Sequence, residues 1–408
     1  MIRGDWAELT WEQYRDALRG VRLPAALVNL NAFDANIERI AEFARRGGKT
    51  LRAASKSLRC PDLLRRVFDR APGAMKGVMA FTCEEAEFLA AQGFDDLLVA
   101  YPTVQPSDLK CLTRLARKKK TATLVVDCRE HVEALARAAK AGRVELRACL
   151  DIDASYRPAG GRVHVGVRRS PIRDEKAAVD LAQYAQQLGG VRVAGAMMYE
   201  AHIAGLPDAN PFSAATNPLR RALKAIAKPD VTDLRRRVAD ALAVAGFALD
   251  FFNGGGTGSL DWTPQDAAVT EVTAGSGFLC SQLFSYFAGV QLTPAAFFAL
   301  QAVRVSDPGF ITCHGGGYIA SGEAGADKLP TPYLPEGLTL VALEGAGEVQ
   351  TPLALGSRTP RILIGDPVLF RHAKAGEPAE RFNEYLLLQD GGVVGSAKTY
   401  RGLGRCFL

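Results

Sequence analysis

The stretch TLRAASKSLRCPDLLRR, residues 50–66, joins a short strand pattern to a helix pattern. Residues 50–54 are predicted to form the strand, and Pro61 stands where a proline commonly begins a helix. The same order, a short apolar run followed by a helical pattern, recurs between about residue 25 and residue 275. Strands that alternate with helices favour a parallel sheet with right-handed crossover connections.

Counting from residue 50, the pattern predicts eight strands. Eight is the number that closes a (β/α)8 barrel, whose active site lies at the C-terminal ends of its strands. The sequence therefore predicts an α/β fold with a TIM-type barrel over residues 25–275, and a doubly wound open sheet is the alternative. The predicted strands are TLRAA (50–54), GVMAF (77–81), DLLVAY (96–101), TLVVD (123–127), ELRACLDI (145–152), VRVAGAMMY (191–199), ALDFFN (248–253) and AVTEVT (268–273).

The character of the sequence changes after the last of these strands. The segments there are strand-like and separated by Gly, Pro and Asp turns, which predicts a C-terminal β-domain over residues 276–408. Residues 1–24 are expected to pack with that β-domain. Within the barrel segment, a helical region at 212–246 is expected to break at Pro218 and Pro229.

The composition indicates which classes of partner the chain can have. A hydrophobic content of 48% and a net charge of +6 over 408 residues are ordinary for a soluble globular protein. The basic run at 117–120 closes a helical pattern, so we expect no nucleic-acid partner. No apolar run approaches the roughly 18 residues of a membrane span. The eight cysteines form no C-x-x-C pair and no signal-peptide pattern is present, which predicts reduced thiols in a cytoplasmic protein.

Lys56 lies between the first predicted barrel strand and the helix at Pro61. Taken alone, a lysine in such a position is a solvated charge. In the mouth of a barrel, however, a lysine amine can act as the nucleophile that forms a Schiff base with an aldehyde.

Two small-residue loops follow the last two predicted strands. In FFNGGGTGS (251–259) the glycines allow backbone N–H groups to approach an anion, although a flexible turn has the same composition. This loop is not a dinucleotide fingerprint, because Ser259 stands where the third glycine would fall, and no P-loop lysine follows. TAGSGF (273–278) is a second such loop. Their positions match the usual phosphate site of these barrels.

Tyr199 and His202 lie in MMYEAH (197–202), directly after the sixth predicted strand. Such side chains can hydrogen-bond a polar ring or move protons, and a structural role is equally open. A reactive lysine after the first strand and a phosphate cradle after the last two together indicate a phosphorylated aldehyde. Pyridoxal 5'-phosphate fits this description.

The order of several segments resembles the pyridoxal-phosphate enzymes of the alanine racemase fold type, and most of all their D-threonine aldolase and D-serine dehydratase branch. The similarity covers nearly the whole chain. It rests on LPAALVNLNAFDANIERIAEFARR (23–46), RAASKSLRCPDLLRR (52–66), FTCEEAEFLAAQGFDDLLVAYP (81–102), MMYEAHIAG, FFNGGGTGS, TAGSGF and PGFITCHGGGYIASG (308–322).

This resemblance implies that Lys56 anchors the cofactor and that Tyr199 lies near its ring. It also implies head-to-tail homodimers, in which each active site lies between one barrel and the β-domain of the partner. The residues implied to hold the phosphate are Gly255, Gly256, Thr257, Ser276 and Gly277.

The chain departs from the resemblance in the β-domain. The aldolase and dehydratase branch implies a divalent metal bound by a His-x-Cys pair, but here His372 is followed by Lys374. A protonated lysine is a poor metal ligand. Either the metal is lost, or Glu377 or Glu380 substitutes as an oxygen ligand. Cys313 and His314 are a further possible source of ligands.

The segment after the fifth barrel strand, residues 153–170, is longer than the resemblance implies. Arg157 and Arg168 in or beside it are candidates to bind a substrate carboxylate, and surface charge is the alternative.

The expected activity is that of a pyridoxal-phosphate lyase on a small D-amino acid, either aldol cleavage or elimination of water. Both reactions need activation of the β-hydroxyl by a metal or by an acid such as His372, and His202 is a second candidate acid or base. The first alternative is a racemase, which needs a second base such as Tyr318 of the partner subunit. The other alternative is a non-catalytic protein that binds pyridoxal phosphate.

Overall fold

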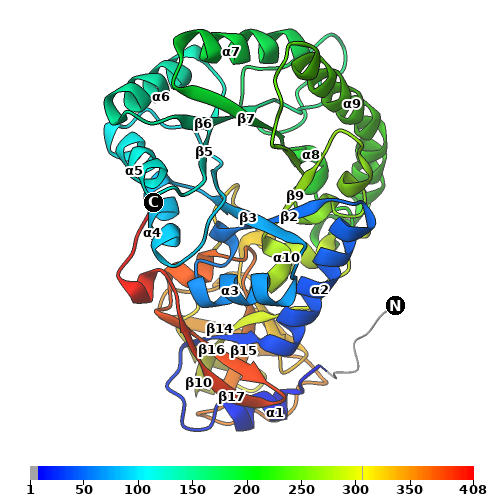
Figure 1. Ribbon diagram of the computed structural model, residues 1–408. Coiled ribbons are helices and arrows are strands. Elements are labelled where there is room, and N and C mark those ends of the chain that lie inside the picture. The colour runs from blue at the N-terminus through cyan, green and yellow to red at the C-terminus, as the bar shows by residue number, and fades with distance from the viewer. Residues whose placement is uncertain (1–7, 306) are drawn as a thin grey trace.

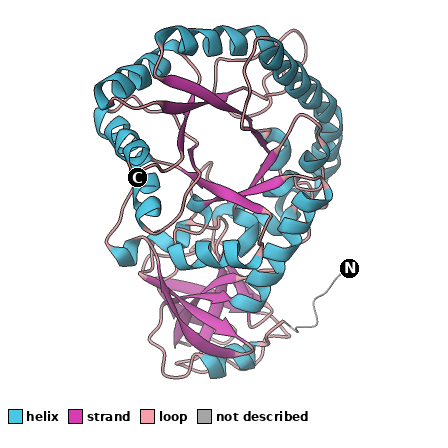
Figure 2. Ribbon diagram, in the orientation of Figure 1, coloured by secondary structure: helices cyan, strands magenta, loops and turns pink. Residues whose placement is uncertain are grey.

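The computed structural model describes residues 8–305 and 307–408 of the chain. Figure 1 shows two parts, a barrel ringed by helices and a smaller β-domain packed beneath it. Figure 2 shows that nearly all helices surround the barrel and that strands dominate the second part. None of the helices in the described ranges combines the length and apolar character that crossing a membrane requires.

Eight parallel strands form a closed barrel, which confirms the predicted fold class. Closure is made by β9, which pairs in parallel with β2 from Thr50–Glu271 to Ala53–Ala274. The open-sheet alternative is therefore wrong. The barrel strands are β2 (Thr50–Ala54), β3 (Met75–Ala80), β4 (Leu97–Val99), β5 (Ala122–Val126), β6 (Leu146–Asp151), β7 (Val191–Met198), β8 (Phe251–Gly254) and β9 (Glu271–Ala274).

Helices cover the outside of the barrel, and their apolar faces pack on the strands. The expected break at Pro229 is wrong, because α9 runs as one helix through that residue. Pro218 lies in its first turn, where the missing N–H would have no partner in any case. The longer helices are α2 (Leu30–Arg46), α3 (Pro61–Arg70), α4 (Cys83–Ala91), α5 (Pro106–Arg117), α6 (Arg129–Gly142), α7 (Glu175–Leu188) and α9 (Asn217–Val244). Two helices of one turn, α8 (Ala201–Ala204) and α10 (Ser276–Leu279), follow the C-terminal ends of β7 and β9.

An ion-pair network closes the N-terminal end of the barrel. The Arg52 guanidinium is fully buried and lies 2.6 Å from Glu271 and 3.0 Å from Asp96. Glu271 begins β9 and Asp96 directly precedes β4, so both lie at the N-terminal ends of strands. This end is filled by paired charges, which leaves the C-terminal ends of the strands as the open mouth.

The β-domain is built on a nine-stranded sheet. Its members include β1 (Ala25–Asn29), which pairs antiparallel with β10 and parallel with β16. The strand at the start of the predicted barrel segment therefore belongs to this sheet, and the barrel begins at β2. The other strands are β10 (Ala296–Arg304), β11 (Phe310–His314), β12 (Thr331–Leu334), β13 (Leu338–Leu340), β14 (Gln350–Leu355), β15 (Pro367–Arg371), β16 (Glu384–Gln389) and β17 (Gly392–Lys398).

The N-terminal helix α1 (Trp11–Ala17) packs on the β-domain. The buried Trp11 indole donates a hydrogen bond of 2.9 Å to the carbonyl oxygen of Pro367 in β15. Residues 1–7 of the predicted N-terminal segment lie outside the described residues.

Candidate active site

Lys56 lies in the short helical turn η1 (Ser55–Ser57) that directly follows β2. Its exposed Nζ donates a hydrogen bond of 2.8 Å to the hydroxyl of Tyr101, which comes just after β4. Burial alone would raise the pKa of Tyr101, but the Lys56 charge and hydrogen bond, aided by Arg169, bring that pKa below its ordinary value. The amine is therefore held over the barrel mouth by a phenol that tolerates partial negative charge.

Arg169 links the ends of three further strands. Its guanidinium carbon lies 5.7 Å from the ring centres of both Tyr101 and Tyr199, and its Nε lies 3.5 Å from Asp151. Asp151 ends β6 and Tyr199 follows β7. Lys56 thus meets this group through Tyr101, so that the side chains of four strand ends gather in one mouth.

Two of these groups have strongly shifted pKa values. Burial raises the pKa of Asp151 to about 6, although the charge of Arg169 opposes the shift. Burial and the neighbouring Glu200 charge raise the pKa of Tyr199 to about 12. A buried carboxyl that titrates near neutrality in a barrel mouth is a candidate acid or base.

The two glycine loops lie side by side next to the Lys56 turn. The Thr257 hydroxyl accepts a hydrogen bond of 3.0 Å from the amide of Gly277, and the hydroxyls of Ser57 and Ser276 are 3.2 Å apart. A Cβ at Gly277 would collide with Thr257, and a Cβ at Gly258 would collide with Phe287. Only glycine fits at these positions, so the loops form a cradle lined by backbone.

A buried ion-pair network supports the first loop from below. Glu200, fully buried, accepts hydrogen bonds from the amide of Gly255 (3.1 Å) and the hydroxyl of Ser259 (2.7 Å). Arg235 of α9 pairs with Glu200 and lies 3.2 Å from Asp266. Burial would raise the pKa of Glu200, but Arg235 and the hydroxyl donors lower it below its ordinary value. A charged Glu200 therefore fixes the shape of the cradle.

His202 lies in α8 and is buried. Neither ring nitrogen has a hydrogen-bond partner among the described residues. Burial lowers the pKa of His202, with Glu200 and Asp153 opposing the shift. The neutral ring therefore has two polar atoms that no described residue engages.

The two arginines predicted to bind a substrate carboxylate, Arg157 and Arg168, lie in different surroundings. Arg157 donates a hydrogen bond of 2.9 Å to Asp153 and is committed to the loop. Arg168 is exposed, whereas its neighbour Arg169 points into the mouth. Arg169 was not predicted from the sequence. It lies in a loop, where the spacing of residues does not indicate which way a side chain points. Tyr101 and Asp151 were detectable, since Tyr101 ends a predicted strand and Asp151 is the second-last residue of another.

The β-domain residues predicted for a metal or for catalysis lie on separate elements. His372 follows β15 and is buried, with Nδ1 2.7 Å from the carbonyl oxygen of Lys374. Tyr318 stacks edge-on against Phe298 at 5.0 Å, and burial raises its pKa. Cys313 is buried in β11, and burial raises its pKa to about 12, so it is an inert core thiol.

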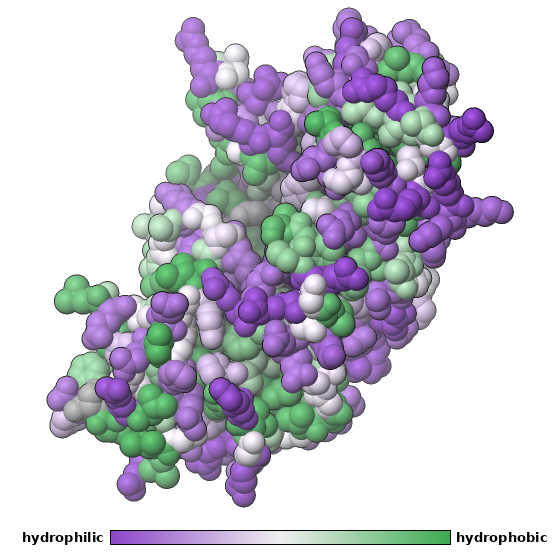
Figure 3. Space-filling model, turned by 90° about the vertical axis from the view of Figure 1, so that its left-hand side faces the viewer, coloured by the Kyte–Doolittle hydropathy of each residue, from purple (hydrophilic) through white to green (hydrophobic). Residues whose placement is uncertain are grey.

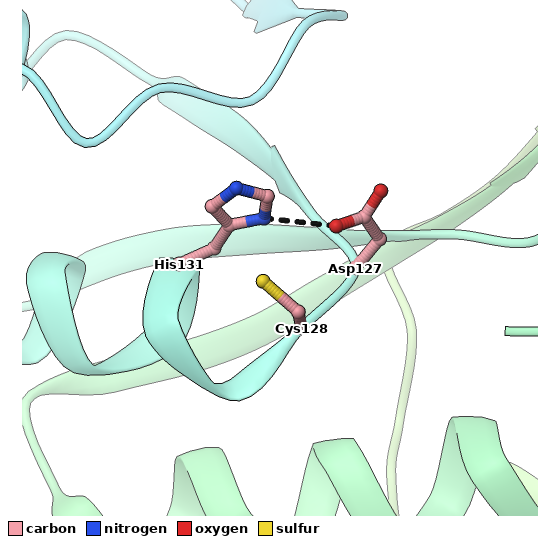
Figure 4. Close-up of side chains that lie close together, drawn as sticks. All are labelled: Asp127, Cys128 and His131. Atoms are coloured by element: carbon pink, nitrogen blue, oxygen red, sulfur yellow. Dashed lines mark ion pairs between the residues drawn. The ribbon is translucent and has the colours of Figure 1, made fainter. Parts of the chain in front are cut away.

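The remaining cluster of potential metal ligands in the described part of the chain lies elsewhere. Asp127, Cys128 and His131 lie at the start of α6, and their ligand atoms are within 4.8 Å of one another. Figure 4 shows Nδ1 of His131 facing Asp127, at 2.9 Å, with the Cys128 thiol below them. The ion pair joins positions i and i+4 across the first turn, which accounts for the arrangement without an ion.

The C-terminal tail lies directly beneath the Lys56 turn. Tyr400 donates a hydrogen bond of 2.8 Å to the fully buried carboxylate of Glu85, which also accepts 2.7 Å from the amide of Phe81. In Figure 1 this tail runs from β17 back to α4 of the barrel. Burial raises the pKa of Glu85 to about 7, although hydrogen bonds from Ser55, Phe81 and Tyr400 oppose the shift.

This raised pKa predicts a pH-dependent stability. Between the ordinary value of 4.5 and about 7, the folded chain retains a proton on Glu85 that the unfolded chain has lost. The free energy of unfolding should therefore fall as the pH rises through this window, by on the order of 1–3 kcal/mol. In Glu85→Gln the decline should be smaller, whereas the exposed neighbour variant Glu84→Gln should keep it. Urea unfolding at several pH values measures the effect, and equal slopes in the wild type and Glu85→Gln would contradict it.

The fold and the site define a class of protein: a closed (β/α)8 barrel with a lysine after its first strand and a glycine cradle after its last two, joined to a β-domain. The alanine racemase N-terminal domain family matches residues 28–252, more than half of the chain. The chain belongs to this family, which confirms the resemblance.

Individual proteins are similar over different lengths. A D-threonine aldolase of an Arthrobacter species is 26% identical over 261 residues, which cover 64% of this chain. The chain spans about 62% of the length of that relative.

Solved structures are similar over nearly the whole chain. The D-threonine aldolase of Filomicrobium marinum superposes with a TM-score of 0.77 at 20% identity, covering 95% of this chain and 97% of that one. A cysteine-to-alanine mutant of D-threo-3-hydroxyaspartate dehydratase, in the metal-free form, gives 0.72 at 20% identity, with 94% and 99% covered. These similarities show the fold.

Proposed function

We propose that this chain is a pyridoxal-phosphate-dependent lyase that acts on small β-hydroxy-D-amino acids. The observation that supports the proposal is that an amine and a cradle suited to an anion lie at the same end of the barrel. Lys56 lies next to Ser57, whose hydroxyl is 3.2 Å from that of Ser276 in the second glycine loop. A phosphorylated aldehyde has one group that suits the amine and another that suits the cradle.

The residues present fit pyridoxal phosphate. The glycines at 255–258 and 275–277 allow close packing of the two loops, and the hydroxyls of Thr257 and Ser276 lie between them as donors of the kind that an anion requires. Thr257 and Ser276 would hold the phosphate with the loop that the glycines shape, and Lys56 would hold the aldehyde. Tyr199 borders the same space, since a Cβ at Gly256 would lie 3.1 Å from its ring. When bound, the cofactor supplies an electron sink for charge at the substrate α-carbon.

The other residues of the mouth orient groups and move protons. Tyr101 fixes the direction of the Lys56 amine, and Arg169 places a permanent positive charge between Tyr101 and Tyr199. Asp151, with a pKa of about 6, can hold or release a proton near neutral pH. We propose His202 as a second proton carrier, because both its nitrogens are free of other partners in the described chain.

The relatives support the substrate class. The similar proteins include D-threonine aldolases and D-threo-3-hydroxyaspartate dehydratase, whose names share a β-hydroxy-D-amino acid. We further propose a head-to-tail homodimer, since Tyr101 beside Lys56 is 43% exposed in the single chain, and a partner subunit would cover it. Figure 3 shows a hollow on one face of the molecule with mixed hydrophilic and hydrophobic surroundings.

The residues around His372 do not provide a suitable set of ligands for a divalent metal. The residue two positions on is Lys374, whose ammonium has no lone pair for a cation. The alternative oxygen ligands are engaged, since Glu380 lies 2.6 Å from Arg59 and Glu377 accepts 3.0 Å from the amide of Ser321. We therefore assign no step of the reaction to a metal at this place.

A product survey tests the proposal. The purified chain with added pyridoxal phosphate is incubated with D-threonine, 3-hydroxy-D-aspartate, D-serine and D-alanine. Glycine with an aldehyde indicates aldol cleavage, and a 2-oxo acid with ammonia indicates elimination of water. L-Alanine from D-alanine without either product indicates a racemase and contradicts the lyase. No product from any substrate supports the non-catalytic alternative.

A further inference from the structure

A segment of the β-domain, residues 372–380, packs directly on the turn that carries Lys56. A Cβ at Gly376 would collide with the carbonyl oxygen of Lys56, so the two backbones are in contact. Arg59 joins them from the side, since its Nε donates 3.2 Å to that oxygen and its Nη1 donates 2.6 Å to Glu380. The segment therefore packs against the backbone of the turn that carries Lys56.

The one basic side chain of this segment apart from His372 is Lys374, and Glu377 and Glu380 are its acidic ones. The Lys374 Nζ donates a hydrogen bond of 2.9 Å to the Ser321 hydroxyl and lies 3.9 Å from the Glu377 carboxylate. Glu377 in turn accepts hydrogen bonds from the amide and the hydroxyl of Ser321. The three side chains form a closed group in which the ammonium is half-buried and fixed in direction.

The Nδ1 atom of His372 is engaged by the turn that carries Lys374. This atom lies 2.7 Å from the carbonyl oxygen and 3.1 Å from the amide of Lys374. His372 thus shapes the turn that presents Lys374.

We infer that the Lys374 ammonium occupies the place of a second metal ligand, so that the β-domain of this chain takes no divalent metal beside His372. A divalent cation near Glu377 would be repelled by the ammonium that already neutralises this carboxylate. This exclusion of metal does not depend on the proposed function, because it follows from the side chains of the β-domain alone. Activity, if present, is accordingly insensitive to chelators.

Metal uptake by matched variants tests the inference. All proteins carry Cys128→Ser, which removes a ligand from the cluster at α6, and are dialysed against Zn²⁺ before metal analysis. The otherwise unchanged chain should hold far less than one equivalent. Lys374→Cys should gain at least about tenfold in Zn²⁺ affinity, because it replaces the ammonium with a thiolate beside Glu377. The control Lys328→Cys removes a nearby lysine, paired with Asp327 at 2.7 Å, and should gain nothing.

Two results would overturn the inference. One is stoichiometric Zn²⁺ in the unchanged chain that His372→Ala abolishes. The other is a Lys374→Cys protein that binds no more Zn²⁺ than Lys328→Cys, since the ammonium would then not be what excludes the ion. Failure of the product survey would contradict the lyase proposal and leave these metal measurements valid.

Discussion

Lys56→Ala is expected to lose the visible absorption band that the purified chain acquires with pyridoxal phosphate, together with its turnover. The substitution removes the only amine that the barrel mouth offers among the described strand ends, next to the cradle at Ser276. The loss in kcat should be at least on the order of 10³-fold, because the same amine also moves protons.

Lys76→Ala is the matched control for this substitution. Lys76 is exposed near the N-terminal end of β3, at the opposite end of the barrel from Lys56. It should keep both the band and the turnover. Reduction with borohydride followed by peptide mapping should locate the cofactor on the peptide that contains Lys56. A Lys56→Ala protein that keeps the band would remove the basis of the proposed function.

Arg235→Met is expected to lower the free energy of unfolding by about 3–5 kcal/mol. Arg235 is fully buried and is the partner of both Glu200 and Asp266, so its loss leaves two buried carboxyl groups without a counter-charge. Urea unfolding measures the change. Because Glu200 shapes the loop at Gly255, the affinity for pyridoxal phosphate should fall with it.

The adjacent residue provides the control for this prediction. Arg236 is 61% exposed and pairs with Asp233 on the helix surface, so Arg236→Met should cost less than about 1 kcal/mol. The double variant Arg235→Met with Glu200→Gln should recover part of the stability, since it removes one unpaired charge. Equal losses in Arg235→Met and Arg236→Met would show that the buried network does not support the cradle.

Several parts of the site were predictable because they depend on local order along the chain. The period of apolar residues predicts the eight barrel strands, and in a closed barrel every loop after a strand faces the same end. Lys56 and the two glycine loops could therefore be assigned to one mouth before the structure was known. Tyr101 and Asp151 obey the same rule, and inspection of every strand end would have found them.

Other parts were not predictable because they depend on packing between distant segments. The path of a long loop determines that Arg169, and not Arg168, points into the barrel mouth. The pairing of Glu200 with Arg235 joins a strand end to a helix 35 residues later, and neither residue type indicates burial by itself.

The sequence by itself determined the barrel, the separate β-domain and the position of a lysine at the barrel mouth. The spacing of apolar residues that marks a strand or a helix is a property of neighbouring residues, so it can be recognised in the sequence without the structure. Only the tertiary structure decided that β1 joins the second sheet, that Gly376 touches the Lys56 backbone and that Lys374 is held by Ser321 and Glu377. These contacts join residues from separate elements, and their distances are set when the barrel and the β-domain pack together.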